Sequence, residues 1–338
     1  MPSLLPHLLR HLLRHLLRLA ALFAVALWLP AHAGAQPAVL HLALARSPLS
    51  LPLRVAETEG YFAAEGLQVR VTECASGRRC LGLLLEGQAD VATAADTAIM
   101  FASFDSRELA LLATVAHTRD DAKLIARRSA GIRQPRDLPG RKVGVLRGTS
   151  AHYFLDAYLL FHGIDPASVV SVPLQPEQTQ AALQSGQVDA VAMWEPLAHK
   201  AALALGDDAI TLKDEGGVYV ETFNLVAHRR MAGPRDAELV ALLRALARAQ
   251  ALIRREPQKA QALMGRWLDL SPAFVSAIWP GLRYGLTLDQ GVVRTMESEA
   301  RWALREGHVK AAVVPNMLSL LHPGPLQAVQ PDAVGLAH

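Results

Sequence analysis

Cysteine is scarce in this chain, and that scarcity argues against a cysteine-rich metal site. The 338 residues contain two cysteines, Cys74 and Cys80, in the stretch "ECASGRRC". Neither has a further cysteine or a histidine close by, as a zinc site would need. In an oxidising compartment, a pair this close in sequence is expected to form a disulfide. The alternative is two reduced, half-buried thiols.

Familiar enzyme motifs are also missing. The stretch "GVLRGTS" has no Gly-Lys-Ser/Thr at the spacing of a phosphate-binding loop. No Gly-x-Ser-x-Gly nucleophile turn occurs. Ser150 and His152 are two positions apart at a predicted helix start, a spacing that does not make them meet. The following histidines show no metal-ligand spacing and are expected on the surface or satisfied in the core: His41, His117, His152, His162, His199 and His228.

Long apolar runs are absent after residue 35, which argues against a later transmembrane span. The first 35 residues combine the basic "LLRHLLRHLLR", the eleven-residue run "LAALFAVALWL" and the small residues of "AHAGA". This layout predicts a secretory signal peptide over residues 1–35, cleaved near Ala33 or Ala35. An uncleaved anchor is the alternative. Export to the periplasm follows from the prediction.

An excess of charge is absent from the expected mature chain. Removing residues 1–35 takes away Arg10, Arg14 and Arg18, which leaves 31 basic and 31 acidic side chains. The pI near 9.0 therefore comes largely from the signal. Without an excess of positive charge, the main argument for binding nucleic acid is lost, and we expect no nucleic-acid partner.

What the chain does contain is an alternation of strand and helix patterns. Apolar strands are predicted at 39–45, 67–74, 89–95, 110–116 and 123–127, with helices between them. A turn-rich stretch precedes a second series with strands at 143–146, 167–174 and 188–194 and short strands near 209–227. From about residue 234 the patterns are helical. The whole predicts an α/β fold with mostly parallel sheets.

Small polar residues follow several of these strands. The turns are "RSPLS" at 46–50, "ASG" at 75–77, "DT" at 96–97 and "GTSAH" at 148–152. Ligands of open α/β sheets bind beyond the carboxyl ends of strands, and helix N-termini favour anions. For one turn alone, a helix cap is the better interpretation of Thr149 or Ser150. Several such turns in both series favour a binding cleft.

At this point the sequence resembles a known family. The stretches "ETEGYFAAEGLQVRV", "GQADVATAADT", "DLPGRKVGVLRGTSAHYFLDAYLLFHGI", "ALQSGQVDAVAMWEP" and "ETFNLVAHR" are similar, in order and spacing, to periplasmic solute-binding proteins of ABC importers. The branch is the one for sulfonates, taurine, nitrate and thiamine-precursor pyrimidines. The resemblance runs from about residue 39 to 325. It is specific for the family and weak for the ligand.

The resemblance implies a type II-like periplasmic binding protein with two lobes. Lobe one would be residues 36–127 plus 228–338, and lobe two 128–227, with a hinge of two crossings near 127 and 228. A small-molecule ligand would bind between the closing lobes, and the closed form would contact a membrane permease and its ATPase. A monomer suffices for this, and neither a cofactor nor catalysis is expected. A sensor subunit and an exported enzyme are the alternatives.

The same comparison suggests which residues hold the ligand. The expected set is Ser47, Leu49, Ser76, Gly77, Asp96, Thr97, Gly148, Thr149, Ser150, Ala151, His152, Trp194, Glu195 and Asn224. Tyr219, Thr222 and Phe223 could add contacts.

Two of these residues bear on the choice of ligand. Trp194 would form an apolar wall, or else belong to the core. Glu195 repels a plain anion, so it fits a zwitterion such as taurine, with the sulfonate at Thr149–Ser150 and the amine near Glu195. Pairing of Glu195 with Arg46, Arg147 or a main-chain donor is a further option. An aminopyrimidine that hydrogen-bonds Glu195, or nitrate, remains the alternative ligand.

Overall fold

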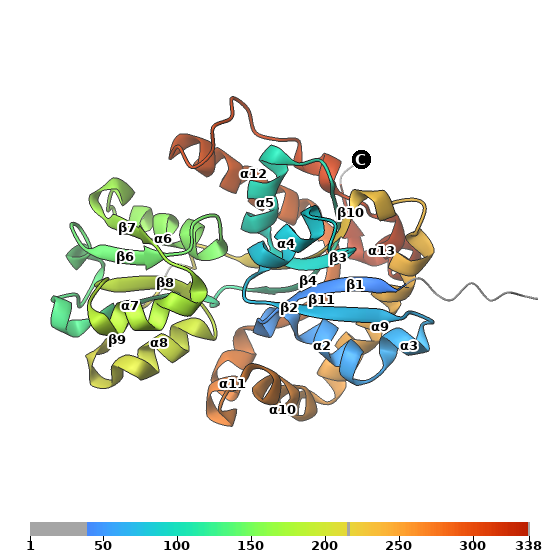
Figure 1. Ribbon diagram of the computed structural model, residues 1–338, viewed down its shortest axis with the longest axis horizontal. Helices are drawn as coiled ribbons and strands as arrows, with labels where there is room; N and C mark the ends of the chain where they lie inside the picture. Colours follow the sequence, from blue (N-terminus) through green and yellow to red (C-terminus); the bar gives the residue numbers. More distant parts are fainter. Residues whose placement is uncertain (1–38, 215–216, 337–338) are drawn as a thin grey trace, which may run out of the picture. The chain divides into compact units, whose positions relative to one another are not determined.

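The computed structural model describes residues 39–214 and 217–336. Its strands form two sheets, one of seven strands and one of five (Figure 1). The predicted signal peptide, with the cleavage positions Ala33 and Ala35, lies outside the described residues. No helix of the described part has both the length and the apolar character that crossing a bilayer requires.

The larger sheet has the strand order β12-β11-β4-β10-β3-β1-β2. Its strands are β1 (Leu40–Ala45), β2 (Val69–Cys74), β3 (Val91–Ala95), β4 (Leu109–Thr118), β10 (Glu221–His228), β11 (Arg283–Asp289) and β12 (Val334–Gly335). The helices that accompany it are α2 (Leu51–Thr58), α3 (Tyr61–Ala64), α4 (Gly77–Leu85), α5 (Asp96–Asp105), α9 (Asp236–Arg255), α10 (Pro257–Leu268), α11 (Pro272–Ile278), α12 (Gln290–Arg305) and α13 (Gly324–Val329).

The smaller sheet has the order β7-β6-β8-β5-β9. Its strands are β5 (Ala122–Arg127), β6 (Lys142–Val145), β7 (Val170–Pro173), β8 (Ala190–Trp194) and β9 (Ala209–Leu212). Three helices accompany this sheet, drawn green to yellow-green in Figure 1: α6 (Ser150–Phe161), α7 (Thr179–Ser185) and α8 (Leu197–Leu205).

Both sheets are mixed, which corrects the expectation of mostly parallel sheets. The pairs β1–β2, β1–β3, β6–β7 and β6–β8 are parallel, as βαβ units should be. β10 runs antiparallel to both β3 and β4, and β5 runs antiparallel to both β8 and β9. Each of these strands enters its sheet directly from a strand of the other sheet, without a crossover helix, so nothing requires a parallel direction.

The crossings between the sheets lie one strand away from the positions near 127 and 228 expected from the sequence. β4 belongs to the larger sheet and β5 to the smaller, so the first crossing is residues 119–121. β9 belongs to the smaller sheet and β10 to the larger, so the second is residues 213–220. The reason for the difference is that β5 and β10 are buried on both faces over most of their length, so their sequences do not show which sheet they join. The division into two functional lobes stays a prediction.

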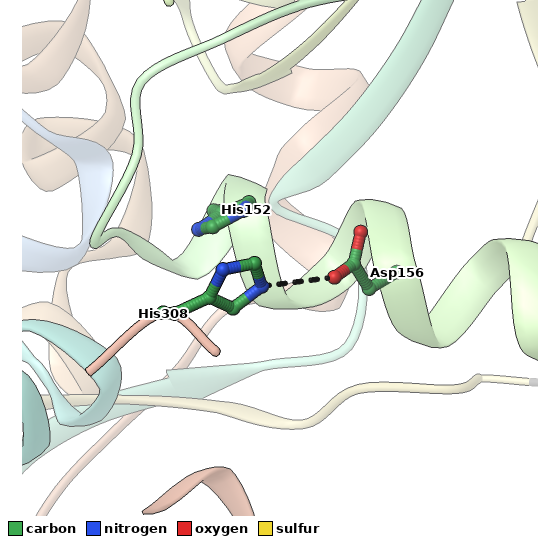
Figure 2. Close-up of side chains that lie close together, drawn as sticks. All are labelled: His152, Asp156 and His308. Atoms are coloured by element: carbon green, nitrogen blue, oxygen red, sulfur yellow. Dashed lines mark hydrogen bonds and ion pairs between the residues drawn. The ribbon is translucent and has the colours of Figure 1, made fainter. Parts of the chain in front are cut away.

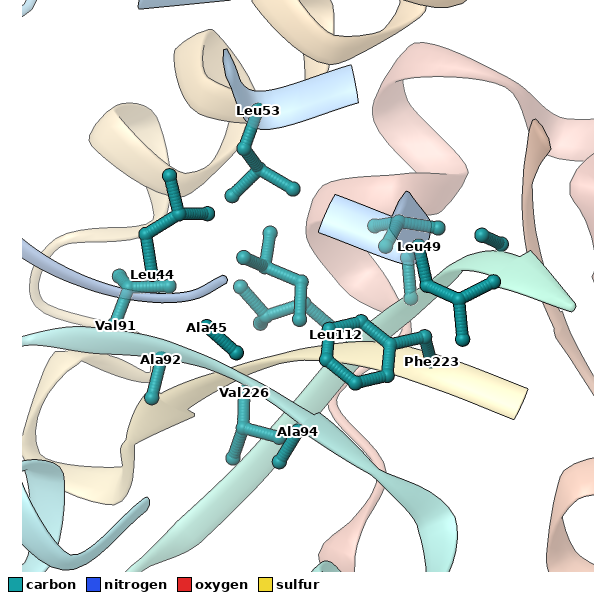
Figure 3. Close-up of a cluster of buried hydrophobic side chains, with 14 of the residues drawn as sticks. Leu44, Ala45, Leu49, Leu53, Val91, Ala92, Ala94, Leu112, Phe223 and Val226 are labelled. Carbon is teal, nitrogen blue, oxygen red and sulfur yellow. The ribbon is translucent and has the colours of Figure 1, made fainter. Parts of the chain in front are cut away.

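Each sheet has its own apolar core. In the larger sheet, Leu44, Val91 and Leu112 are fully buried against helix and loop residues such as Leu49 and Leu53 (Figure 3). In the smaller sheet, the core includes Phe154, Leu155 and Tyr158 of α6. Because the smaller sheet has a core of its own, α6 can bury its apolar face there. Its first residues can therefore lie where the two sheets meet.

The predicted helical return after residue 234 is present, except for strand β11 and the two-residue strand β12. Helices α9 to α12 follow the predicted helical patterns. Between α11 and α12, however, β11 pairs antiparallel with β4. The pattern "RYGLTLD" alternates buried and exposed residues only weakly, and it was not predicted as a strand.

Candidate functional site

A pocket lies where strand ends of the two sheets meet. Ala45 and Ala95 are the last residues of β1 and β3, Ala75 follows β2, and Trp194 ends β8. We call this the inter-sheet pocket. Its lining residues are Ala45, Arg46, Ser47, Ala75, Ser76, Gly77, Arg78, Ala95, Ala98, Asp121, Thr149, Ser150, Trp194, Glu221 and Phe223. Its position beyond the carboxyl ends of parallel strands is the usual place for a ligand in α/β folds.

Two helix N-termini reach this pocket, one from each sheet. Ser76 caps α4, because its Oγ accepts a hydrogen bond from the main-chain N–H of Arg79 at 3.2 Å. Thr149 precedes α6 but does not cap it with its side chain; its hydroxyl donates to the carbonyl oxygen of Leu146 at 2.7 Å. The capping interpretation therefore applies to Ser76 and not to Thr149. Two helix N-termini together favour a negatively charged group.

Two arginines contribute positive charge to the pocket. Arg46 is held in place by Glu73, whose Oε2 accepts from Nη1 at 2.7 Å, and by the carbonyl oxygen of Trp267. Arg78, on α4, donates to the carbonyl oxygen of Arg147 in the smaller-sheet part. Arg78 thus connects the two parts at the rim of the pocket.

Two buried acids, Asp121 and Glu221, line the same pocket. Burial, and the neighbouring Glu195 carboxylate, raise the pKa of Asp121 well above its usual range. Burial and the Asp121 charge do the same to the pKa of Glu221, while the Ser150 hydroxyl lowers it by donating a hydrogen bond. Oε2 of Glu221 is buried and has no partner within the described residues. A cationic group of a ligand would favour ionisation of both acids.

Trp194 and Phe223 form apolar walls of the pocket, and both are almost fully buried. The cavity volume is about 30 Å³, which is room for roughly one water molecule. A second, larger cavity of about 650 Å³ lies beside it and shares Arg78 and Ala98 with it. We call this the outer cavity.

Six of the residues predicted from the sequence line the inter-sheet pocket: Ser47, Ser76, Gly77, Thr149, Ser150 and Trp194. Gly77 has a packing role there as well, since a Cβ at this position would lie 2.8 Å from the Cα of Ala94 in β3. Ser47 caps the short turn that follows β1 by accepting from the N–H of Leu49.

The other predicted residues lie elsewhere. Leu49 and Ala151 are buried in the two apolar cores. Gly148 and His152 line the outer cavity. Asn224 is buried in β10, where its Oδ1 accepts from the hydroxyl of Thr114 at 2.7 Å.

Asp96 and Thr97 belong to a buried network beside the pocket. Oδ2 of Asp96 accepts from the N–H and the hydroxyl of Thr222, at 3.0 and 2.9 Å, and Oδ1 accepts from Tyr219. The hydroxyl of Thr97 donates to Oε1 of Glu299 at 2.6 Å. These contacts are made to the protein itself and tie the second crossing to α5 and α12.

Glu195 does not line the inter-sheet pocket. Its Oε2 accepts the main-chain N–H of His199 in the first turn of α8 at 3.0 Å, which is the main-chain pairing considered from the sequence. Arg46 pairs with Glu73 instead, and the carbonyl oxygen of Arg147 accepts from Arg78. Burial raises the pKa of Glu195 to about 7.

Cys74 and Cys80 form a disulfide with a Cα–Cα distance of 5.6 Å. It links the end of β2 to the first turn of α4, and so holds the "ASG" turn at the pocket.

Sequence reasoning missed Arg78, Asp121 and Glu221. Asp121 lies in the first crossing and Glu221 directly follows the second. Because the crossings were expected elsewhere, these two acids had no reason to be placed at the pocket. Arg78 directly follows the predicted "ASG" turn, and its position was the available signal.

The comparison with known proteins supports one fold family. The NMT1/THI5-like family matches residues 47–260. A relative from Escherichia coli (strain K12), named "Putative aliphatic sulfonates-binding protein", is 26% identical over 249 residues, which are 72% of this chain and 73% of the relative. The taurine-binding periplasmic protein of the same organism is 27% identical over 180 residues, 53% of this chain and 54% of that protein, so the chain spans about half its length.

Solved structures agree on the fold. The alkanesulfonate-binding protein SsuA from Xanthomonas axonopodis pv. citri, bound to MOPS, aligns with a TM-score of 0.73 at 21% identity, over 90% of this chain and 100% of that one. The desulfurization enzyme DSZB aligns with a TM-score of 0.64 at 16% identity, over 87% of this chain and 99% of that one. At these identities the likeness shows the fold alone, and the fold is shared by binding proteins and an enzyme.

Proposed function

Since the chain belongs to the NMT1/THI5-like family, we propose that it is an extracytoplasmic solute-binding receptor of an ABC importer. Its ligand would be a small sulfonate or a taurine-like zwitterion, bound in the inter-sheet pocket. The loaded protein would deliver the ligand to a membrane permease driven by an ATPase. The two relatives from Escherichia coli are named for binding aliphatic sulfonates and taurine, which supports this ligand class.

The observation that carries the proposal is the charge arrangement of the inter-sheet pocket. The N-termini of α4 and α6, with Arg46 and Arg78, suit a sulfonate group. Asp121 and Glu221, both buried, suit an ammonium group. A plain alkanesulfonate would leave these acids protonated, whereas a zwitterion would use both ends of the pocket.

The pocket size supports a hinge. A cavity of about 30 Å³ is too small for a sulfonate, because it holds roughly one water molecule. The ligand would therefore enter after the two sheets move apart, and the hinge would lie at residues 119–121 and at residues 213–214 and 217–220 of the second crossing. The two lobes would be the residues that accompany each sheet.

Binding without turnover is part of the proposal. Both cysteines are joined in a disulfide, so neither is a free thiol nucleophile. Ser150 bonds Glu221 and His152 accepts from Gly148, so these two do not form a nucleophile–base pair. Incubation of the protein with a bound ligand, followed by mass analysis of the released molecule, should return it unchanged.

Calorimetric titration tests the ligand class directly. The protein, unfolded and refolded to remove any bound solute, is titrated with taurine, ethanesulfonate, nitrate and an aminopyrimidine. We expect taurine to bind most tightly. Thr149→Ala/Ser150→Ala should weaken the binding of both sulfonates by at least about tenfold, because in the open pocket these hydroxyls would turn from Leu146 and Glu221 to the charged group. Glu221→Gln should weaken the binding of taurine and leave the affinity for ethanesulfonate unchanged.

The matched control is Ser168→Ala, which removes a hydroxyl from a turn of the smaller-sheet part far along the chain from the pocket. It should leave every affinity unchanged. Stronger binding of ethanesulfonate than of taurine would reject the zwitterion. Tight binding of the aminopyrimidine alone would move the protein to the thiamine-precursor class.

A further inference from the structure

A second group of side chains with ligand chemistry lies outside the inter-sheet pocket. His152 and Asp156 are four residues apart on α6, so they share one face of the helix. His308 follows α12, which accompanies the larger sheet, and its ring lies beside both of them (Figure 2). The group therefore joins elements of the two sheets.

The three side chains converge closely. One ligand atom from each, an imidazole nitrogen or a carboxylate oxygen, lies within 4.8 Å of the others. Nε2 of His308 is 3.3 Å from Oδ2 of Asp156, and the two imidazole ring centroids are 4.4 Å apart. Ligands of one tetrahedral zinc ion at about 2.0–2.1 Å from it are separated by about 3.3 Å. Small side-chain rotations bring the set to that spacing.

The surroundings fix the orientation of these ligands. Nε1 of Trp302 donates to Oδ2 of Asp156 at 3.1 Å. The Trp302 ring also packs against both imidazoles, with centroid distances of 5.2 Å to His152 and 4.7 Å to His308. A hydrogen bond to a ligating carboxylate is the outer-shell support that metal sites use. The N–H of Gly148 donates to Nδ1 of His152 over 3.4 Å, which is a long and therefore weak hydrogen bond. A change of tautomer that places the ring proton on Nδ1 would therefore cost little free energy.

Solvent can reach the site. His152 and His308 line the outer cavity, which has room for water as a further ligand.

The charges that face the site act in opposite directions. Arg78, Arg147 and Lys310 line the outer cavity and oppose a cation, while Asp105 lines it and favours one. Asp156, within the site, supplies the negative charge nearest to the ligand atoms. The side chain of Asp156 is 10% exposed, so solvent screens that charge little.

We propose that His152, Asp156 and His308 form a binding site for a divalent first-row transition metal ion such as Zn²⁺. Two imidazoles and one carboxylate, with a water in the fourth position, are a ligand set that zinc accepts. Because the ligands come from α6 and from the segment after α12, the bound ion fastens the smaller-sheet part to the larger. The ion thus stabilises the arrangement in which the inter-sheet pocket is narrow.

Zn²⁺ titration followed by calorimetry tests the site, with the chain purified without a histidine tag. We expect one ion per chain. His308→Ala should weaken binding by at least about 100-fold, which is the upper end of the loss caused by removing an outer-shell partner. The matched control is His162→Ala, an exposed histidine at the end of the same helix α6, which should leave the affinity unchanged.

Three further measurements complete the test. Asp156→Asn keeps an acceptor for the N–H of Trp302 but removes the negative charge, so it should also weaken Zn²⁺ binding. Co²⁺ in place of Zn²⁺ should give intense visible absorption in the native protein and not in His308→Ala. Zn²⁺ should raise the midpoint of thermal unfolding in the native protein and in His162→Ala only. Absence of Zn²⁺ binding, or equal binding by the native protein and His308→Ala, would overturn the proposal.

Discussion

The hydroxyl of Tyr219 donates a hydrogen bond to Oδ1 of Asp96, which joins the second crossing to the first residue of α5. The other oxygen of Asp96 is occupied by Thr222 of β10. Burial raises the pKa of Asp96, and these donors lower it. Asp96 was predicted as a ligand residue, yet its oxygens are used by the protein. This network is an anchor of the crossing.

Tyr219→Phe tests that anchor. The change removes one donor to a fully buried carboxyl group and keeps the ring that packs edge-to-face on Tyr153. We expect the free energy of unfolding to fall by about 1–3 kcal/mol, the cost of leaving a buried polar group without its partner. Urea unfolding measures it. Tyr61→Phe, on the half-exposed helix α3, is the control and should change the stability little. Equal effects in the two variants would contradict the anchor.

The start of α4 gives a second prediction. A Cβ on Gly77 would lie 2.8 Å from the Cα of Ala94, so Gly77→Ala forces α4 away from β3. The variant should lose about 1–3 kcal/mol of stability. It should also bind sulfonates more weakly, because the helix N-terminus moves from the pocket.

Gly82→Ala is the matched control for Gly77→Ala, since it lies in the same helix. Its Cβ would meet only the ends of the Arg79 and Glu86 side chains, at 3.9 Å. We expect this change to stabilise the protein by up to about 1 kcal/mol, as alanine does in place of glycine within a helix. A Gly77→Ala variant as stable as Gly82→Ala would show that α4 has more room than the structure indicates.

Much of the fold could be predicted from the sequence because its signals are local. The Val143–Leu146 strand, the glycine turn and the apolar period from Phe154 to Phe161 are contiguous, and they form β6 and α6 as expected. Long-range pairing is not local. The residues of β10 predict neither its direction nor its place between β3 and β4. Both depend on which strand edges elsewhere in the sheet are free to pair.

In the candidate site, too, local signals could place some residues, whereas others depend on long-range contacts. Residues in turns that follow strands, such as Ser76 and Thr149, could be placed at the pocket by the rule for strand ends. Asp121 and Glu221 could not, because they reach it through the crossings. The group of His152, Asp156 and His308 was also invisible, since His308 is more than 150 residues from its partners. Spacing along the chain shows no ligand pattern among the histidines, because these three side chains meet only in the folded protein.

The disulfide gives a third prediction. It closes a short loop, because Cys74 and Cys80 have a sequence separation of 6. Removing it with Cys74→Ala/Cys80→Ala should lower the free energy of unfolding by about 2 kcal/mol, from the restored entropy of the unfolded chain. A reducing agent should destabilise the native protein by a similar amount and leave the double variant unchanged. Two free thiols in the unfolded, unreduced protein would contradict the bridge.

Glu195 gives a prediction about pH. Its pKa is about 7 in the folded protein, against an ordinary value of 4.5, because the carboxyl group is buried. Between these values the folded protein keeps a proton that the unfolded chain has released. The contribution of Glu195 to stability is therefore present below about pH 4.5 and is lost as the pH rises to about 7.

Glu195→Gln removes this dependence while it keeps an oxygen to accept the N–H of His199. Measured by urea unfolding from pH 4.5 to 8, the stability of the variant relative to the native protein should rise by about 3 kcal/mol across the range. Glu177→Gln, at an exposed position, should run parallel to the native protein at every pH. A difference between Glu195→Gln and the native protein that does not change with pH would show that Glu195 ionises at its ordinary pKa.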